Sequence, residues 1–175
     1  MPIRLLTPDT IGKIAAGEVV ERPSSVVKEL IENSIDARAT RIQVELRGGG
    51  LELIEVTDNG IGIGAEDLPL TLERHATSKL TAFDDLDRLI TLGFRGEALA
   101  SISAVSDFSL KSRTSGQAAG HQIRSLFGSA PVTSSVAAPT GTTISARDLF
   151  GNVPARRKFL RQPSTESGYV GRVVS

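Results

Sequence analysis

The spacing of apolar residues changes once along the chain, and this change limits the folds that the chain can adopt. In the first part, apolar side chains recur at helical spacing over residues 11–20 and 23–36. In the later part they alternate with polar residues in short segments bounded by Gly, Pro and Ser, which predicts strands at 108–113, 121–126, 132–136 and 142–146. Helices that gather early and strands that gather late favour an α+β fold. We expect a two-layer sandwich in which one mixed, mostly antiparallel sheet is covered on one face by helices.

The remaining segments complete this outline. Residues 41–47 alternate as a half-buried strand, three glycines at 48–50 predict a hairpin turn, and residues 51–57 form the return strand. We expect a loop at 58–64, a helix over 66–74, a loop at 77–83, a short helix at 84–91, a glycine loop that opens a helix through residue 103, and a short helix at 155–160.

Composition excludes several kinds of site. The chain has no cysteine, which excludes disulfides and thiolate metal sites. It has two histidines, which disfavours a histidine-rich metal site. No apolar stretch approaches the roughly 20 residues that span a bilayer. The first residues also lack the pattern of a signal peptide, so we expect a cytoplasmic protein with no membrane contact.

Charge is balanced overall but not along the chain. The net charge is zero, which gives no bulk reason to expect nucleic acid as a partner. From Arg147 onward, however, basic residues outnumber the two acids Asp148 and Glu166; they are Arg147, Arg156, Arg157, Lys158, Arg161 and Arg172. This excess is compatible with a solvated basic helix face or with a contact to DNA or another phosphate.

The helix over residues 23–36 carries a polar edge. At about 100° per residue, Glu29, Glu32, Asn33 and Asp36 fall within an arc of roughly 100°. A solvated acidic face would look the same. Asn33 is unusual in mid-helix, however, and an amide oxygen beside carboxylates suits a hard cation such as Mg²⁺.

Two glycine-containing segments are candidate ligand loops. Asp58 follows a strand and precedes Gly60 and Gly62, which is typical of a turn but would also let a flat ring approach a carboxylate that accepts a hydrogen bond from an amine. The segment 93–99 places glycines before a helix start, where free backbone N–H groups bind phosphate, although Gly96 could be only a helix cap. The chain contains no P-loop and no dinucleotide-binding fingerprint.

Five sequence strings together resemble the ATP-site motifs of the MutL family of mismatch repair proteins. They are ELIENSIDA at 29–37, DNGIG at 58–62, HATSK at 75–79, GFRGEAL at 93–99 and GTT at 141–143. A further match is NVPARRKFL at 152–160, so the resemblance covers residues 1–161. That family shares its superfamily with DNA gyrase, a heat-shock chaperone and histidine kinases. The resemblance implies a Bergerat-type ATP-binding fold over residues 1–161, with 162–175 starting the connection to a second domain that the chain lacks.

The resemblance also implies roles for individual residues. Glu29 is similar to the general base of hydrolysis, Asn33 to the Mg²⁺ ligand, and Asp58 to the residue that reads adenine. The remaining nucleotide-binding residues implied by these motifs are Asp36, Gly62, Thr77, Ser78, Lys79, Gly93, Arg95, Gly96, Glu97, Ala98, Leu99 and Thr143. Thr77–Lys79 and Arg95–Leu99 resemble a mobile lid and a phosphate-binding segment, although His75 and Lys79 could equally be ordinary surface side chains.

The resemblance implies an ATP-gated clamp that couples mismatch recognition to repair. Its cofactors would be ATP and Mg²⁺. Its partners would be a second copy, bound through the segment before Pro23 when ATP is present, weakly bound DNA, and mismatch recognition and downstream repair proteins. Relatives carry a later domain that supplies a lysine to the γ-phosphate, so we expect this chain alone to be a weak or inactive Mg²⁺-dependent ATPase.

Other functions would use the same fold. A nucleotide-controlled interaction module would bind ATP with incidental hydrolysis, but Glu29 favours hydrolysis. The HATSK and GFRGEAL strings distinguish the chain from a type II topoisomerase subunit, and the acid at position 29 is unlike the histidine kinase branch.

Overall fold

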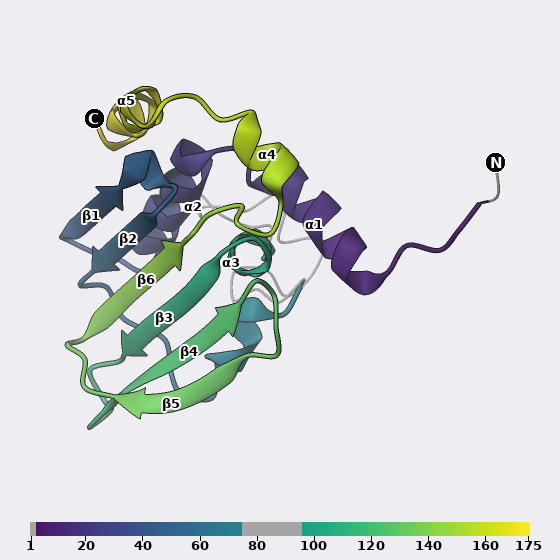
Figure 1. The fold of residues 1–175 in the computed structure, drawn as a ribbon. Coiled ribbons are helices and arrows are strands. Elements are labelled where there is room, and N and C mark those ends of the chain that lie inside the picture. Colours follow the sequence, from purple (N-terminus) through teal and green to yellow (C-terminus); the bar gives the residue numbers. More distant parts are fainter. Residues whose placement is uncertain (1–2, 75–95) are drawn as a thin grey trace, which may run out of the picture.

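One six-stranded sheet organises residues 3–74 and 96–175, the part of the chain that the computed structural model describes (Figure 1). The strand order is β1-β2-β6-β3-β4-β5, and each neighbouring pair is antiparallel. The strands are β1 (Ile42–Arg47), β2 (Leu53–Asp58), β3 (Asp107–Arg113), β4 (Gly120–Leu126), β5 (Val132–Val136) and β6 (Gly141–Arg147). All six agree with the strands predicted from alternation to within two residues at each end.

Helices cover one face of this sheet (Figure 1). The helices of the described part are α1 (Pro8–Val19), α2 (Pro23–Asp36), α3 (Ala98–Ala104), α4 (Pro154–Lys158) and α5 (Pro163–Val174), with short 3-10 turns η1 (Gly48–Gly50) and η2 (Pro69–Leu72), and α4 and α5 lie toward one end of the sheet (Figure 1). Proline begins both α1 and α2, where its fixed φ suits the first helical turn and its missing N–H costs nothing. The predicted α+β sandwich is therefore confirmed.

The core lies between the sheet and the helices. On β3, Phe108, Leu110 and Ser112 are buried, whereas the residues between them are partly or fully exposed. Val27 and Leu30 of α2 are buried in the same apolar cluster. Alternation with a period of two thus gives each strand one covered face and one polar face. Any ligand loop at the strand ends consequently rests on a packed base.

The helix predicted over residues 66–74 is wrong. The structure has turns there and only the 3-10 turn η2, whose bonds include Thr71 N to Leu68 O at 3.2 Å. Pro69 explains the difference, because it donates no backbone hydrogen bond and disfavours helical geometry at Leu68. The loop predicted at 77–83 and the helix predicted at 84–91 lie outside the described residues.

The polar stretch after Gln162 is also more ordered than a connection would require. It forms α5, which packs against α2 and η1. Val170 is buried within the main apolar cluster, and the Glu166 side chain is fully buried. In the described part of the chain, the core therefore extends past residue 161. The predicted link to a second domain stays a prediction.

The first described residues leave the body of the protein. Residues 3–7 run outward in extended form before α1 begins (Figure 1). Ile3 and Leu5 are fully exposed, and Leu6 is 53% exposed. This arm therefore presents apolar side chains that no other part of the described structure covers. Among residues 3–74 and 96–175, none of the helices has both the length and the apolar character needed to cross a bilayer.

Candidate nucleotide site

The polar edge of α2 lies beside the buried side of the helix. Glu29, Glu32, Asn33 and Asp36 are each half-buried, next to the fully buried Leu30. Glu32 has an ion pair with Lys28 of its own helix, at 3.9 Å. The four side chains are therefore partly withdrawn from water, which a freely solvated acidic face would not require. An amide oxygen beside carboxylates is a kind of ligand that suits Mg²⁺, but within residues 3–74 and 96–175 no three His, Cys, Asp or Glu side chains come together as a metal site.

Asp58, at the end of β2, is held in a fixed orientation. One carboxylate oxygen, Oδ2, lies 2.8 Å from the hydroxyl of Ser34, which is buried on α2. The other, Oδ1, accepts a hydrogen bond from the backbone N–H of Gly60 at 2.9 Å. The Ser34 hydroxyl also lies 3.1 Å from the Leu30 carbonyl, but its single proton gains more from the closer, charged acceptor. Each carboxylate oxygen keeps a lone pair for a further donor.

The loop after Asp58 is fastened to the end of α2. The side-chain oxygen of Asn59 accepts from the N–H groups of Thr40 and Arg41, each at 2.9 Å. The N–H of Ile61 donates to the carbonyl of Ala37 at 3.0 Å. A Cβ added at Gly60 would lie 2.6 Å from that same carbonyl, so only glycine fits. The DNGIG string thus brings the carboxylate of β2 against the helix that carries the polar edge.

Two further glycines let backbones meet at this end of the sheet. Gly62 has a φ of +77°, and a Cβ there would lie 2.1 Å from the carbonyl oxygen of Arg113. Gly141 has a φ of +121°, and a Cβ there would lie 2.1 Å from the carbonyl oxygen of Asp58. Side chains are disfavoured at both positions by backbone conformation and by space. The loop 58–64 therefore lies directly on the ends of β3 and β6.

The structure does not bring Thr143 to the face that carries Asp58. Its hydroxyl lies 3.2 Å from that of Thr57, which alternates with Asp58 on β2 and lies on the opposite face. The residue paired with Asp58 across the sheet is instead Thr142, which is 8% exposed. Alternation could have indicated this, because Thr142 shares a face with the buried Ile144.

The predicted phosphate segment is described only in part. Gly96 has a φ of +63°, a conformation that favours glycine, and it immediately precedes α3, where Ala98 and Leu99 form the first turn. Glu97 is half-buried at the helix start. Figure 1 shows α3 on the covered face of the sheet, the same face as α2. The other residues predicted for this region lie outside the described residues; they are Thr77, Ser78, Lys79, Gly93 and Arg95.

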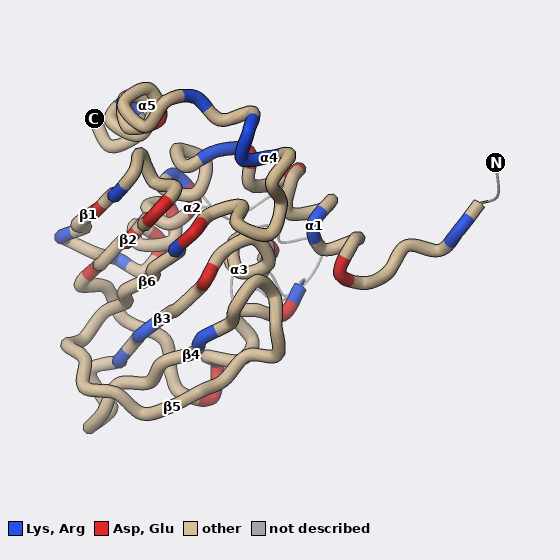
Figure 2. The backbone as a smooth tube through the Cα atoms, viewed as in Figure 1, with Lys and Arg blue, Asp and Glu red and all other residues tan. Residues whose placement is uncertain are grey.

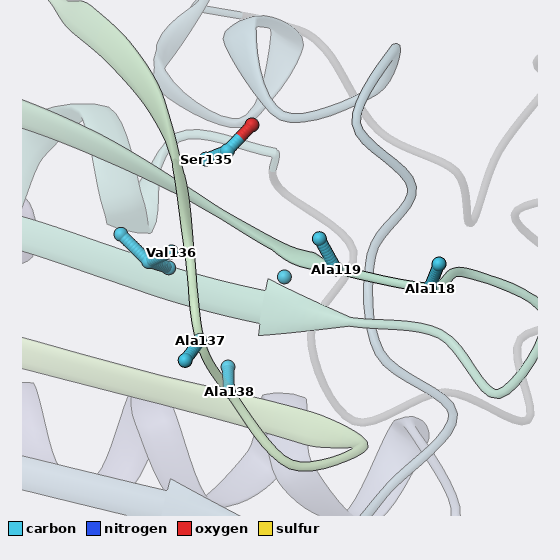
Figure 3. A pocket seen from close by; sticks show the side chains of 7 residues that line it. Ala118, Ala119, Ser135, Val136, Ala137 and Ala138 are labelled. Atoms are coloured by element: carbon cyan, nitrogen blue, oxygen red, sulfur yellow. The ribbon is translucent and has the colours of Figure 1, made fainter.

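Two cavities lie away from the polar edge of α2, and the smaller of them reaches Asp58. The larger, about 410 Å³, lies between the ends of β4 and β5 (Figure 3). Its lining consists of small side chains: Ala118, Ala119, Gly120, Ser135, Val136, Ala137 and Ala138. The smaller, about 230 Å³, is lined by Thr57, Lys111 and Thr143 of the uncovered face and also by Asp58, Gly141 and Thr142 at the strand ends. Neither cavity includes the polar edge of α2.

Part of the basic C-terminal set serves the fold. Figure 2 shows basic residues concentrated on α4 and the segment that follows it. Arg156 donates to the carbonyls of Gly17 and Val20 at the end of α1, at 2.6 and 3.3 Å. Arg157 pairs with Asp148. These contacts account for two of the six basic residues, and the alternative of a phosphate contact remains open for the exposed ones.

Comparison with known proteins places these features in one family. The sequence profile described as "Histidine kinase-, DNA gyrase B-, and HSP90-like ATPase" matches residues 21–147. The DNA mismatch repair protein MutL of Serratia proteamaculans is 55% identical over 99% of this chain, and that of Mannheimia succiniciproducens is 54% identical over the same share. This chain spans 28% of the length of each of these relatives.

Solved structures show the same fold. The Aquifex aeolicus MutL ATPase domain complexed with ADP has a TM-score of 0.69 and 39% identity, over 89% of this chain and 54% of that one. The N-terminal domain of a DNA repair protein has a TM-score of 0.77 and 30% identity, over 94% of this chain and 47% of that one. The resemblance to the MutL family drawn from the motifs is thus confirmed.

Proposed function

The chain belongs to the family of histidine kinase-, DNA gyrase B- and HSP90-like ATPases, and on this premise we propose that it binds and hydrolyses ATP as the ATPase domain of a MutL-type mismatch repair protein. The observation that carries the proposal is the fixed carboxylate of Asp58, which faces the helix with the polar edge. A solved relative, the Aquifex MutL ATPase domain, was obtained with ADP, which supports a nucleotide as the ligand.

Asp58 reads the base in this proposal. Two hydrogen bonds already orient its carboxylate, and its remaining lone pairs accept the exocyclic amine of adenine. Guanine has a carbonyl oxygen at the same position, which would face the carboxylate without a proton between them. Gly60 and Gly62 keep side chains out of the loop beside it, so that a flat ring can approach. ATP is consequently preferred over GTP.

The polar edge of α2 serves the phosphates and the water. Glu29 acts as the general base that orients and deprotonates the attacking water, and Asn33, one turn further, holds Mg²⁺. When bound, Mg²⁺ neutralises charge on the phosphate oxygens. Asp36 and the backbone N–H groups of 96–99 complete the binding of the nucleotide, together with Thr77–Lys79, Gly93 and Arg95.

The larger protein would act as an ATP-gated dimeric clamp. The arm at residues 3–7 exposes Ile3 and Leu5, which a second copy would bury on closing. DNA, mismatch recognition proteins and downstream repair proteins are the partners that this function needs. The exposed basic residues Lys158 and Arg161 supply charge for a weak DNA contact. A cytoplasmic location follows from this function.

Measurement of phosphate release distinguishes a protein that hydrolyses ATP from an interaction module that ATP binding only controls. The full-length protein and its Glu29→Ala variant are compared in single-turnover assays with Mg²⁺-ATP. The Lys28→Ala variant is the matched control, because Lys28 lies beside Glu29 on α2 but is exposed. If the protein is an ATPase, only Glu29→Ala should lose the chemical step. Equal rates in all three proteins would leave an interaction module in which hydrolysis is incidental.

A further inference from the structure

The strand β5 is an open edge of the sheet. It lies last in the strand order, and β4 is its only neighbour among the strands of residues 3–74 and 96–175. Residues 132–135 are exposed, and Val136 is half-buried. Figure 1 shows β5 at the rim of the sheet opposite to β1. The backbone N–H and C=O groups on its outer side are therefore available to pair with another strand.

The two edges of the sheet differ in charge. The other edge strand, β1, carries Glu45 and Arg47, which form an ion pair at 2.9 Å. Around β5, by contrast, residues 125–146 contain no Asp, Glu, Lys, Arg or His. Charged side chains protect an edge strand, because pairing would bring them against like charges or remove them from water. The edge at β1 thus has this protection, and the edge at β5 lacks it.

The sequence of β5 is suited to pairing with a second copy of itself. Its five residues, VTSSV at 132–136, have a valine at each end and hydroxyl side chains between them. When two copies lie antiparallel about Ser134, Val132 of each copy lies opposite Val136 of the other. Thr133 of each copy then lies opposite Ser135 of the other. Apolar pairs and hydroxyl pairs of this kind both stabilise a sheet, and the contact is closed and symmetric.

A recess at one end of β5 matches a projection at the other end. The larger cavity, about 410 Å³, is lined by the small side chains of residues 118–120 and 135–138 (Figure 3). At the start of the strand, Pro131 is exposed and Val132 is 68% exposed. The antiparallel register about Ser134 places Pro131 of the second copy opposite Ala137. The apolar projection of each copy therefore comes next to the recess of the other, where both lose contact with water.

We infer that β5 is a self-association edge, through which two copies of this chain join their sheets into one continuous antiparallel sheet. The contact uses neither the arm at residues 3–7 nor a nucleotide, so it is separate from the proposed ATP-gated closure. Two paired strands of five residues bury less than the roughly 1,200 Å² of a stable interface. The contact is therefore weak alone and forms where two copies are already held close together.

Disulfide trapping in the full-length protein tests this contact and its register, after any cysteine beyond residue 175 has been replaced by serine. Ser134→Cys places two thiols opposite each other on the symmetry axis, where the Cα atoms lie about 4.5–5.5 Å apart, within the range of a disulfide. Ser135→Cys is the matched control, because residue 135 is exposed on the same strand. Its two copies lie two residues out of register, more than about 8 Å apart, which a disulfide does not span. We expect mild oxidation to link Ser134→Cys at least about tenfold faster than Ser135→Cys.

A mixture of two proteins checks the register independently. Thr133→Cys and Ser135→Cys lie opposite each other across the axis, so the mixed disulfide should form faster than either like pair. Adding Ser134→Lys to both proteins should abolish the mixed disulfide, because two positive charges then meet on the axis. Gln122→Lys is the control for this change, since Gln122 of β4 is in register with Ser134 but lies one strand away from the axis. It should leave the mixed disulfide intact.

Three results would overturn the inference. Equal linking at positions 134 and 135 would indicate random collision rather than strand pairing. Absence of linked dimers in Ser134→Cys would show that a second copy does not occupy this edge, even if a strand of another protein does. Equal loss of the mixed disulfide with Gln122→Lys and Ser134→Lys would attribute the effect to charge in general rather than to the axis. None of these results depends on ATP binding, so failure of the proposed function is distinguishable from failure of this inference.

Discussion

Asp58 is the residue on which base recognition depends, and its removal is a sharp test. Asp58→Ala should weaken ATP binding by about 1–3 kcal/mol, because it deletes an acceptor and leaves the Ser34 hydroxyl and the Gly60 N–H without their partner. Calorimetric titration with ATP measures the change. Asp67→Ala is the control, since Asp67 is exposed outside the site, and it should bind ATP as wild type does.

Asn33 and Glu29 should separate binding from chemistry. Asn33→Ala should weaken binding of Mg²⁺-ATP, because the metal ligand acts in the ground state. Glu29→Ala should leave the ATP dissociation constant nearly unchanged and lower the single-turnover rate, since its role belongs to the transition state. Both constants are measured on the full-length protein. Wild-type affinity for Mg²⁺-ATP in Asn33→Ala would remove the metal role from this residue.

For single residues, the sequence predicted where a side chain lies in its helix or strand better than it predicted which other side chains it contacts. The half-buried edge of Glu29 and Asn33 follows from helical periodicity, and Asp58 from its place after a strand. Ser34 and Ser112 were not singled out, because a buried serine looks like any small residue until its partners are known. Both serines lie on the apolar face of their element, and the spacing of apolar residues could therefore have indicated that they are buried.

Arg156 joins two elements, α4 and α1. Its guanidinium donates to the carbonyls of Gly17 and Val20 and lies 5.8 Å from the centre of the Phe150 ring. Arg156→Ala should lower the free energy of unfolding by about 1.5–3 kcal/mol, because these bonds come from a charged donor that satisfies helix-end carbonyls. Denaturant titration measures this. Lys158→Ala, an exposed change on the same helix, should shift it by less than about 0.5 kcal/mol.

Glycines in α5 and in the loop after β2 should respond oppositely to alanine. Gly168 lies in the middle of α5 with open space where a Cβ would be, so Gly168→Ala should raise the free energy of unfolding by about 0.5–1 kcal/mol. Gly62→Ala should lower it, because the Cβ would meet the Arg113 carbonyl. A destabilised Gly168→Ala variant would contradict a helix at this position.

Elements were predictable where one periodicity ran without interruption. The strands of the later part alternate cleanly, and the structure confirms them. The predicted helix at 66–74 was wrong because Pro69 interrupts it, a local effect that outweighs residue spacing. Helix α5 was missed because its first turn is polar and two glycines weaken its pattern, while its contacts with α2 come from tertiary packing that no local pattern contains.

The whole molecule brings distant segments to one end of one sheet. Residue 58 of β2, residue 142 of β6 and residue 112 of β3 meet there because the order β2-β6-β3 places late strands beside an early one. The motifs implied a shared site, but the row across the strands depends on this topology and on register. The register places Thr142 beside Asp58, whereas Thr143, which the motifs implied as a nucleotide-binding residue, pairs with Thr57.

Adenine recognition by this fold is best tested by a comparison of two nucleotides. ATP and GTP carry the same phosphates and sugar, so every contact except those to the base is held constant. Calorimetric titration of the protein with each nucleotide, in the presence of Mg²⁺, gives both dissociation constants. We expect ATP to bind at least about tenfold more tightly than GTP, corresponding to one hydrogen bond gained by adenine. Equal affinity for the two nucleotides, or tighter binding of GTP, would contradict it.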